Sequence, residues 1–159
     1  MLTLEKPTTR PTRYGAEMRE VAELDEHTLC RLRENAALVV KQAGTLTDFA
    51  FGYTPESLEW LDGFIERLRA GGMFDGTGGI DGYLNVFGSY LGEAVIHAVG
   101  GTWKRCDGDL GVTLPEGNWA FPFAKVEKLL RGEDGQSLRG FYEAALALPQ
   151  FAQDKKEQE

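Results

Sequence analysis

The chain has 159 residues, of which 42% are hydrophobic and 26% are charged, and this balance is typical of one globular domain rather than a disordered or membrane-spanning chain. The formal net charge of −8 opposes nucleic-acid phosphates, so it argues against nucleic-acid binding. The charge would attract a basic partner, or it simply keeps the protein soluble, which is the interpretation we favour from the charge alone. The two cysteines lie far apart and no apolar run reaches the roughly 18 residues of a membrane span, so we expect a cytoplasmic protein without a disulfide scaffold.

The two ends of the sequence are poor in side chains that can pack. Residues 1–13 combine prolines, threonines and basic side chains, and residues 150–159 are polar and of mixed charge. We therefore expect a flexible N-terminal arm, a flexible C-terminal tail and a single α+β domain over residues 14–149. Near the start of this domain, residues 16–24 are interpreted as a short turn of helix.

Two amphipathic helices are predicted in the first half of the domain. The first follows Asp25, a good N-cap residue, and extends to Gly44 with apolar side chains at helical spacing. The second begins at Pro55, where the hydroxyl of Thr54 can cap the free backbone amides, and it ends at Gly71. Each helix should bury one apolar face.

Two side chains of the second helix, Trp60 and Asp62, lie off its apolar stripe and should sit at the border of the core or in solvent. The following residues, 71–82, include six glycines, which predicts an irregular loop. This loop matches neither a phosphate-binding nor a calcium-binding pattern. A third helix, over residues 81–98, has a broad apolar surface, which indicates the central helix of the fold.

After the third helix, the pattern changes to short β-like runs. The dipeptides Asp107–Gly108 and Glu116–Gly117 separate these runs and favour tight turns between antiparallel strands. The sequence therefore predicts a three-stranded antiparallel meander, with strands at residues 102–106, 110–114 and 118–121.

Two further helices complete the predicted fold. One opens at Pro122 and ends before Gly132, and the other is capped near Asp134 or Ser137. The expected fold class is α+β, with about five helices packed on a small three-stranded antiparallel β-meander.

The third helix holds the sharpest candidate site for a ligand or partner. Glu93 and His97 are four residues apart, so their side chains share one helix face, and Tyr90 and Trp103 should lie nearby. A carboxylate beside an imidazole can orient a general base or a metal ligand. A metal would need a further ligand and catalysis would need a nucleophile or a pocket, so we favour a structural Glu93 bonded to buried backbone amides.

Catalytic motifs are not recognisable elsewhere in the sequence. Neither cysteine has a local histidine context, and no Gly-x-Ser-x-Gly elbow occurs. We therefore predict no enzymatic activity, no metal and no cofactor.

Gly88 and Gly92 have the small-x-x-x-small spacing, which lets a neighbouring element approach a helix closely. We interpret them as a structural feature that packs tightly against a neighbouring helix or the sheet. Room for a ligand beside Tyr90 or Trp103 is the functional alternative.

Residues 53–66, 88–103 and 122–128 together resemble the uncharacterised bacterial proteins of the DUF3806-like family. The spacing of Leu-Gly-Glu and Gly-Gly-x-Trp within the second stretch carries most of the likeness. The resemblance implies a small bacterial cytoplasmic domain, and it implies that Gly92, Glu93, Gly101 and Trp103 form the recurrent junction between the central helix and the first strand. It brings no established activity.

The function expected from these patterns is that of a non-enzymatic protein-binding domain. An immunity or inhibitor protein that docks on a basic partner through its acidic surface would fit the charge and the small size. The alternative is a small-ligand-binding protein or an enzyme that uses the region of Glu93 and His97.

Overall fold

The structure is a computed structural model that describes residues 20–76 and 79–158, with side chains up to residue 148. The N-terminal arm expected over residues 1–13 lies outside these residues. In chain order, the elements are β1 (Val21–Ala22), α2 (Glu26–Gly44), α3 (Pro55–Ala70), α4 (Ile80–Val99), β2 (Thr102–Cys106), β3 (Asp109–Thr113), the 3-10 turn η1 (Pro115–Gly117), β4 (Trp119–Ala120), α5 (Pro122–Leu130) and α6 (Leu138–Gln158).

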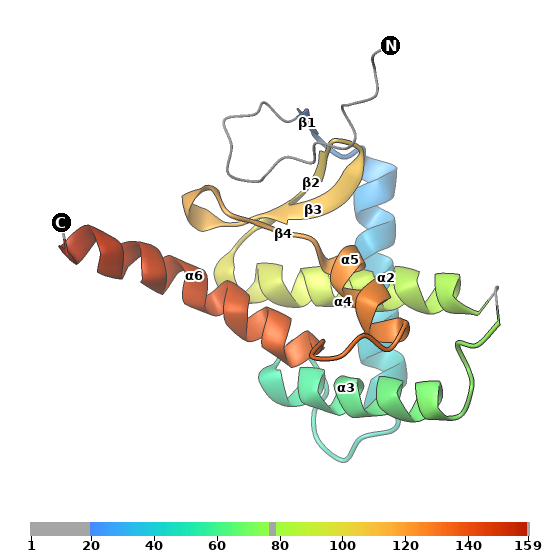
Figure 1. Ribbon diagram of the computed structural model, residues 1–159. Helices are drawn as coiled ribbons and strands as arrows, with labels where there is room; N and C mark the ends of the chain where they lie inside the picture. Colours follow the sequence, from blue (N-terminus) through green and yellow to red (C-terminus); the bar gives the residue numbers. More distant parts are fainter. Residues whose placement is uncertain (1–19, 77–78, 159) are drawn as a thin grey trace, which may run out of the picture.

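The elements surround α4, which is the central helix, as its broad apolar surface predicted. Figure 1 shows the sheet at one end of the molecule, α4 beneath it and α3 at the far end, while α2 crosses α4 and spans the distance between these ends. Helix α4 contacts α2, α5, α6 and β3, and its residues 87–95 are all buried. The α+β class is confirmed.

Helices α2 and α3 begin where their capping residues predicted. The Asp25 carboxylate accepts a hydrogen bond from the backbone N–H of Thr28 at 2.9 Å, and the Thr54 hydroxyl accepts one from the N–H of Ser57 at 3.1 Å. Each bond satisfies an amide that has no partner inside its own helix.

The sheet has four strands rather than the predicted three, in the order β1-β2-β3-β4, and all neighbours are antiparallel. The additional strand, Val21–Ala22, pairs with the edge of β2, so the helical turn predicted over residues 16–24 is wrong for the residues that the structure describes. Hydrogen bonds from the Asp107 N–H to the Glu20 carbonyl and from the Glu20 N–H to the Asp107 carboxylate extend this pairing. A two-residue strand held by distant partners has no periodicity of its own to detect.

The turn between β2 and β3 follows the sequence signal closely. Asp107 and Gly108 have φ angles of 55° and 89°, as the two central residues of a type I′ hairpin require. Glycine adopts this conformation without steric cost, and aspartate tolerates it better than most residues.

The last helix, α6, is capped twice at its start. The Ser137 hydroxyl accepts a hydrogen bond from the Gly140 N–H at 2.8 Å, as one of the two predicted caps. The carboxylate of Asp62 on α3 accepts bonds from the N–H groups of Leu138 and Arg139 at 2.7 and 3.1 Å. Asp62 therefore joins α3 to α6 instead of simply lying at the border of its helix.

Helix α6 also extends further than the sequence predicted. It continues to Gln158, so residues 150–158, which we expected to form a flexible tail, are helical. In Figure 1 its second half extends away from the other elements.

Candidate functional site

The glycine strip of α4 lies under two aromatic rings. A Cβ atom placed on Gly92 would be 2.1 Å from the Trp103 ring of β2, and one placed on Gly88 would be 2.3 Å from the Phe123 ring of α5. A Cβ on Gly101 would be 2.4 Å from the carbonyl oxygen of Thr113. The glycines therefore admit aromatic side chains and a strand backbone rather than leaving room for a ligand.

Glu93 is a buried carboxylate at this junction. Its side chain faces Trp103, whose indole Nε1–H donates a hydrogen bond to Glu93 Oε2 at 2.9 Å. The two residues are only 8% and 3% exposed. Burial removes most of the water from both polar groups, and the hydrogen bond between them compensates for this loss. The partner of Glu93 is thus an indole N–H, where the sequence led us to expect backbone amides.

His97 lies one helical turn further along α4, at the edge of this buried pair. Its Nε2 atom is 3.7 Å from Glu93 Oε1, and its side chain is 54% exposed. The imidazole stacks on the Tyr53 ring with 4.3 Å between ring centroids. The site therefore presents one accessible imidazole above a carboxylate that solvent hardly reaches.

Tyr53 connects the imidazole to Tyr90. The two tyrosine rings stack with centroids 5.3 Å apart, and the fully buried Tyr90 donates its hydroxyl hydrogen to the Gly52 carbonyl at 2.5 Å. Sequence reasoning missed Tyr53 because it precedes the cap of α3, where helical spacing no longer predicts contacts. The only local signal for Tyr53 is that an aromatic residue directly precedes Thr54, the N-cap residue of α3.

Burial affects the acidity of both tyrosines. It raises the pKa of Tyr53, and the nearby Glu93 carboxylate raises that pKa further. Burial is also the main cause of the raised pKa of Tyr90. Both phenols therefore hold their protons more tightly than a free tyrosine does, so neither supplies a phenolate base near pH 7.

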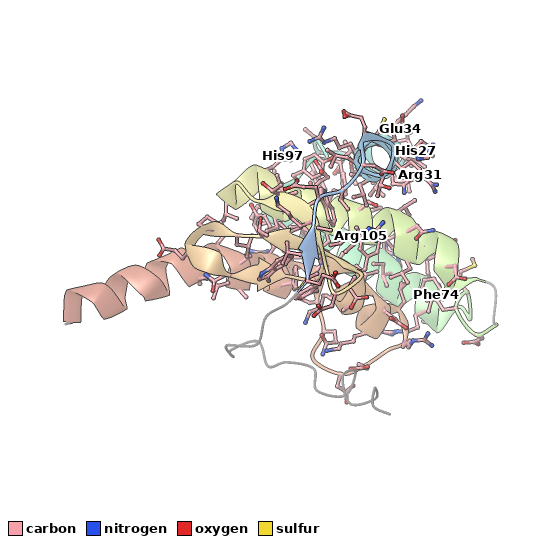
Figure 2. All side chains as sticks on the ribbon, turned by 90° about the horizontal axis from the view of Figure 1, so that it is seen from above. His27, Arg31, Glu34, Phe74, His97 and Arg105 are labelled. Carbon is pink, nitrogen blue, oxygen red and sulfur yellow. The ribbon has the colours of Figure 1, made fainter. Side chains whose placement is uncertain are left out.

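The chain's other histidine lies elsewhere. Figure 2 shows His27 with Arg31 and Glu34 on α2, whereas His97 lies on α4. Among the side chains that the structure describes, no group of three or more His, Cys, Asp or Glu is arranged to hold a metal ion.

A second feature is a group of exposed carboxylates around β1, which we call the acidic end. The pairing of β1 with β2 places Glu20 beside the β2–β3 turn, and Glu23 lies beside Lys104 of β2. Two cationic side chains, Lys104 and Arg105, belong to the same region. The six carboxylates of the acidic end are Glu20, Glu23, Asp25, Glu26, Asp107 and Asp109.

Comparison with models of protein families, with curated proteins and with solved structures gave no match. The resemblance to DUF3806-like proteins therefore stays a prediction. In the part of the chain that the structure describes, no helix combines the length and the apolar character needed to cross a membrane.

Proposed function

We propose that the protein is a non-enzymatic binding domain that docks on a basic protein through its acidic end. The observation that carries this proposal is the group of six exposed carboxylates around β1, which among the described residues of β1, β2 and their turn stands beside two cationic side chains. Glu23 is paired with Lys104, and among the described residues the other five form no salt bridge with a cationic side chain of the chain itself.

Electrostatics gives this arrangement its physical meaning. Unneutralised carboxylates repel one another, and a basic surface that approaches them relieves the repulsion. Such complementarity accelerates association and excludes acidic partners, and its effect weakens as salt concentration rises. An inhibitor or immunity protein that covers a basic surface of its target is one role that fits this chemistry.

Affinity capture with a neutralised variant tests the proposal. We expect the immobilised wild-type protein to retain a stoichiometric protein from a lysate of the source cells at low salt and to release it at high salt. The triple variant with Glu26→Gln, Asp107→Asn and Asp109→Asn should lose this protein, because each change removes a charge and keeps the side-chain shape.

The matched control removes carboxylates from another surface. The exposed residues Glu133 and Asp134 lie between α5 and α6, so the double variant with Glu133→Gln and Asp134→Asn should retain the same protein. A captured protein that stays bound at high salt, or that both variants fail to retain, would contradict docking through the acidic end. The lack of any stoichiometric partner would contradict it as well.

A second candidate function is supported by the pair of Glu93 and His97. An accessible imidazole stacked on Tyr53 above a buried carboxylate could bind a small polar ligand or take part in proton transfer. Thermal-shift screening with metabolites tests this candidate. A ligand that raises the melting temperature of the wild type but not of the His97→Ala variant would support it, and the absence of such a ligand would count against it.

A further inference from the structure

A pocket opens between α2, α3 and α4, and its α2 residues lie near the end of that helix. The acidic end lies at the other end of α2, beside β1, as Figure 1 shows for these two elements. The volume of the pocket is about 190 Å³. Pockets for drug-sized ligands are larger, at roughly 300–1,000 Å³, whereas an apolar cavity of about 150 Å³ suffices for benzene. The volume therefore points to a molecule with about one ring.

The lining of the pocket combines aliphatic side chains with four aromatic rings. Trp60 and Phe64 contribute from α3, and Tyr83 and Phe87 contribute from α4. Aromatic rings pack favourably against one another edge to face or in offset stacks, beyond the effect of the buried area alone. A flat aromatic molecule would therefore gain more from this lining than an aliphatic molecule of the same size.

The polar character of the pocket is slight. Gln42 supplies an amide and Tyr83 a hydroxyl, and among the described residues no charged side chain lines the pocket. A buried ionic ligand would lose its hydration without an opposite charge in the lining to replace it. The ligand should therefore be uncharged.

The mouth of the pocket carries two leucines that are unusually exposed. Leu38 and Leu46 both line it, and they are 46% and 60% exposed. Exposed apolar side chains beside an apolar hollow are typical of a binding site. The mouth is thus open to solvent and lets a small molecule enter.

We propose that this pocket binds a small, uncharged, single-ring aromatic molecule. The site is separate from the acidic end and does not depend on it, so the protein would bind a small ligand whether or not it also docks on a basic protein. The volume argues against a large ligand, the four aromatic rings favour an aromatic over an aliphatic ligand, and the lack of charge argues against an ion.

Methyl-detected NMR with toluene as the probe tests the proposal. We expect saturable shifts in the methyl signals of Leu38, Val39, Leu61 and Val86, and unchanged signals from the distant Val112. Methylcyclohexane, which has the same carbon skeleton in a puckered ring without aromatic character, should bind several-fold more weakly. Inositol, a polar ring, should cause no shifts in these methyl signals.

Three variants show whether binding occurs in the pocket. Ala43→Leu fills it from α2, and Leu38→Asp places a charge at its mouth on an exposed position that tolerates the change. Each should weaken toluene binding by roughly an order of magnitude. The control, Leu146→Asp, changes an exposed leucine of α6 and should leave binding unchanged.

Several results would overturn the proposal. These are the absence of saturable shifts up to the solubility limit of toluene, equal binding of methylcyclohexane or inositol, and unchanged binding in Leu38→Asp. If the Ala43→Leu variant fails to fold, the Leu38→Asp variant alone decides. Shifts in the same methyl signals that follow protein concentration without toluene would assign the pocket to self-association instead.

Discussion

The buried hydrogen bond between Glu93 and Trp103 gives the clearest prediction for a single residue. Glu93→Gln keeps an oxygen that can accept the indole N–H, so it should cost less than about 1 kcal/mol of unfolding free energy. Glu93→Ala leaves a buried N–H without a partner and should cost about 1–3 kcal/mol. Urea unfolding followed by circular dichroism measures both.

His97 provides the control for this pair. Its side chain is largely exposed and 3.7 Å from the carboxylate, so His97→Ala should change the unfolding free energy by less than about 0.5 kcal/mol. An equal loss in Glu93→Gln and Glu93→Ala would show that the carboxylate charge, rather than the hydrogen bond to Trp103, stabilises the junction.

Tyr53 gives a prediction for alkaline pH. Because burial and the Glu93 carboxylate raise its pKa above the ordinary value near 10, the folded protein holds the phenolic proton more tightly than the unfolded chain does. The resulting stabilisation is complete below pH 10 and is lost as the pH rises through the folded-state pKa. Ultraviolet titration of the phenols measures that pKa.

Two variants assign the titration and its cause. Tyr53→Phe should remove one late-titrating phenol and lessen the loss of stability at high pH. Glu93→Gln should lower the pKa of Tyr53 because it removes the repulsion between carboxylate and phenolate. If the Tyr53 titration is the same in wild type and Glu93→Gln, the carboxylate does not act on this phenol.

At the scale of the element, α4 offers two glycines in opposite surroundings. A methyl group on Gly92 would collide with the Trp103 ring, whereas one on Gly82 would meet no atom within 4 Å. Gly92→Ala should therefore lose about 1–3 kcal/mol through overpacking. Gly82→Ala should gain up to about 1 kcal/mol because alanine favours the helix. A Gly92→Ala variant as stable as Gly82→Ala in urea unfolding would refute the close packing of β2 on α4.

Signals between neighbours in sequence predicted most helices and turns. The features that the sequence did not predict depend on contacts between residues far apart in the chain. The helix starts at Asp25 and Thr54 and the Asp107–Gly108 turn depend on neighbours in sequence, so they could be predicted. Strand β1 forms only because β2 lies beside it. Asp62 caps a helix that begins 76 residues later, and no spacing within α3 indicates that role.

The candidate site divides in the same way. The shared face of Glu93 and His97 follows from helical geometry, and the nearness of Trp103 follows from the short connection between α4 and β2. Tyr53 joins them through tertiary packing alone. The acidic end and the aromatic pocket likewise combine segments that are far apart in sequence, so only the fold reveals them.

At the scale of the whole molecule, the net charge of −8 predicts that salt stabilises the protein. The Debye length falls from about 30 Å at 0.01 M to about 8 Å at 0.15 M salt, so sodium chloride should weaken repulsion among the carboxylates and raise the melting temperature. Much of this response should come from the acidic end, because five of its six carboxylates form no salt bridge with a cationic side chain among the described residues.

The triple variant at Glu26, Asp107 and Asp109 separates local repulsion from net charge. It should melt at a higher temperature than the wild type in low salt and respond less to added salt, since fewer charges remain to be screened. The double variant at Glu133 and Asp134 also reduces the net charge but should keep most of the salt response. Calorimetry at several salt concentrations measures these differences.

An equal response of the melting temperature to salt in the two variants would mean that repulsion is spread over the whole surface. A wild-type melting temperature that does not depend on salt would mean that repulsion between carboxylates does not limit stability.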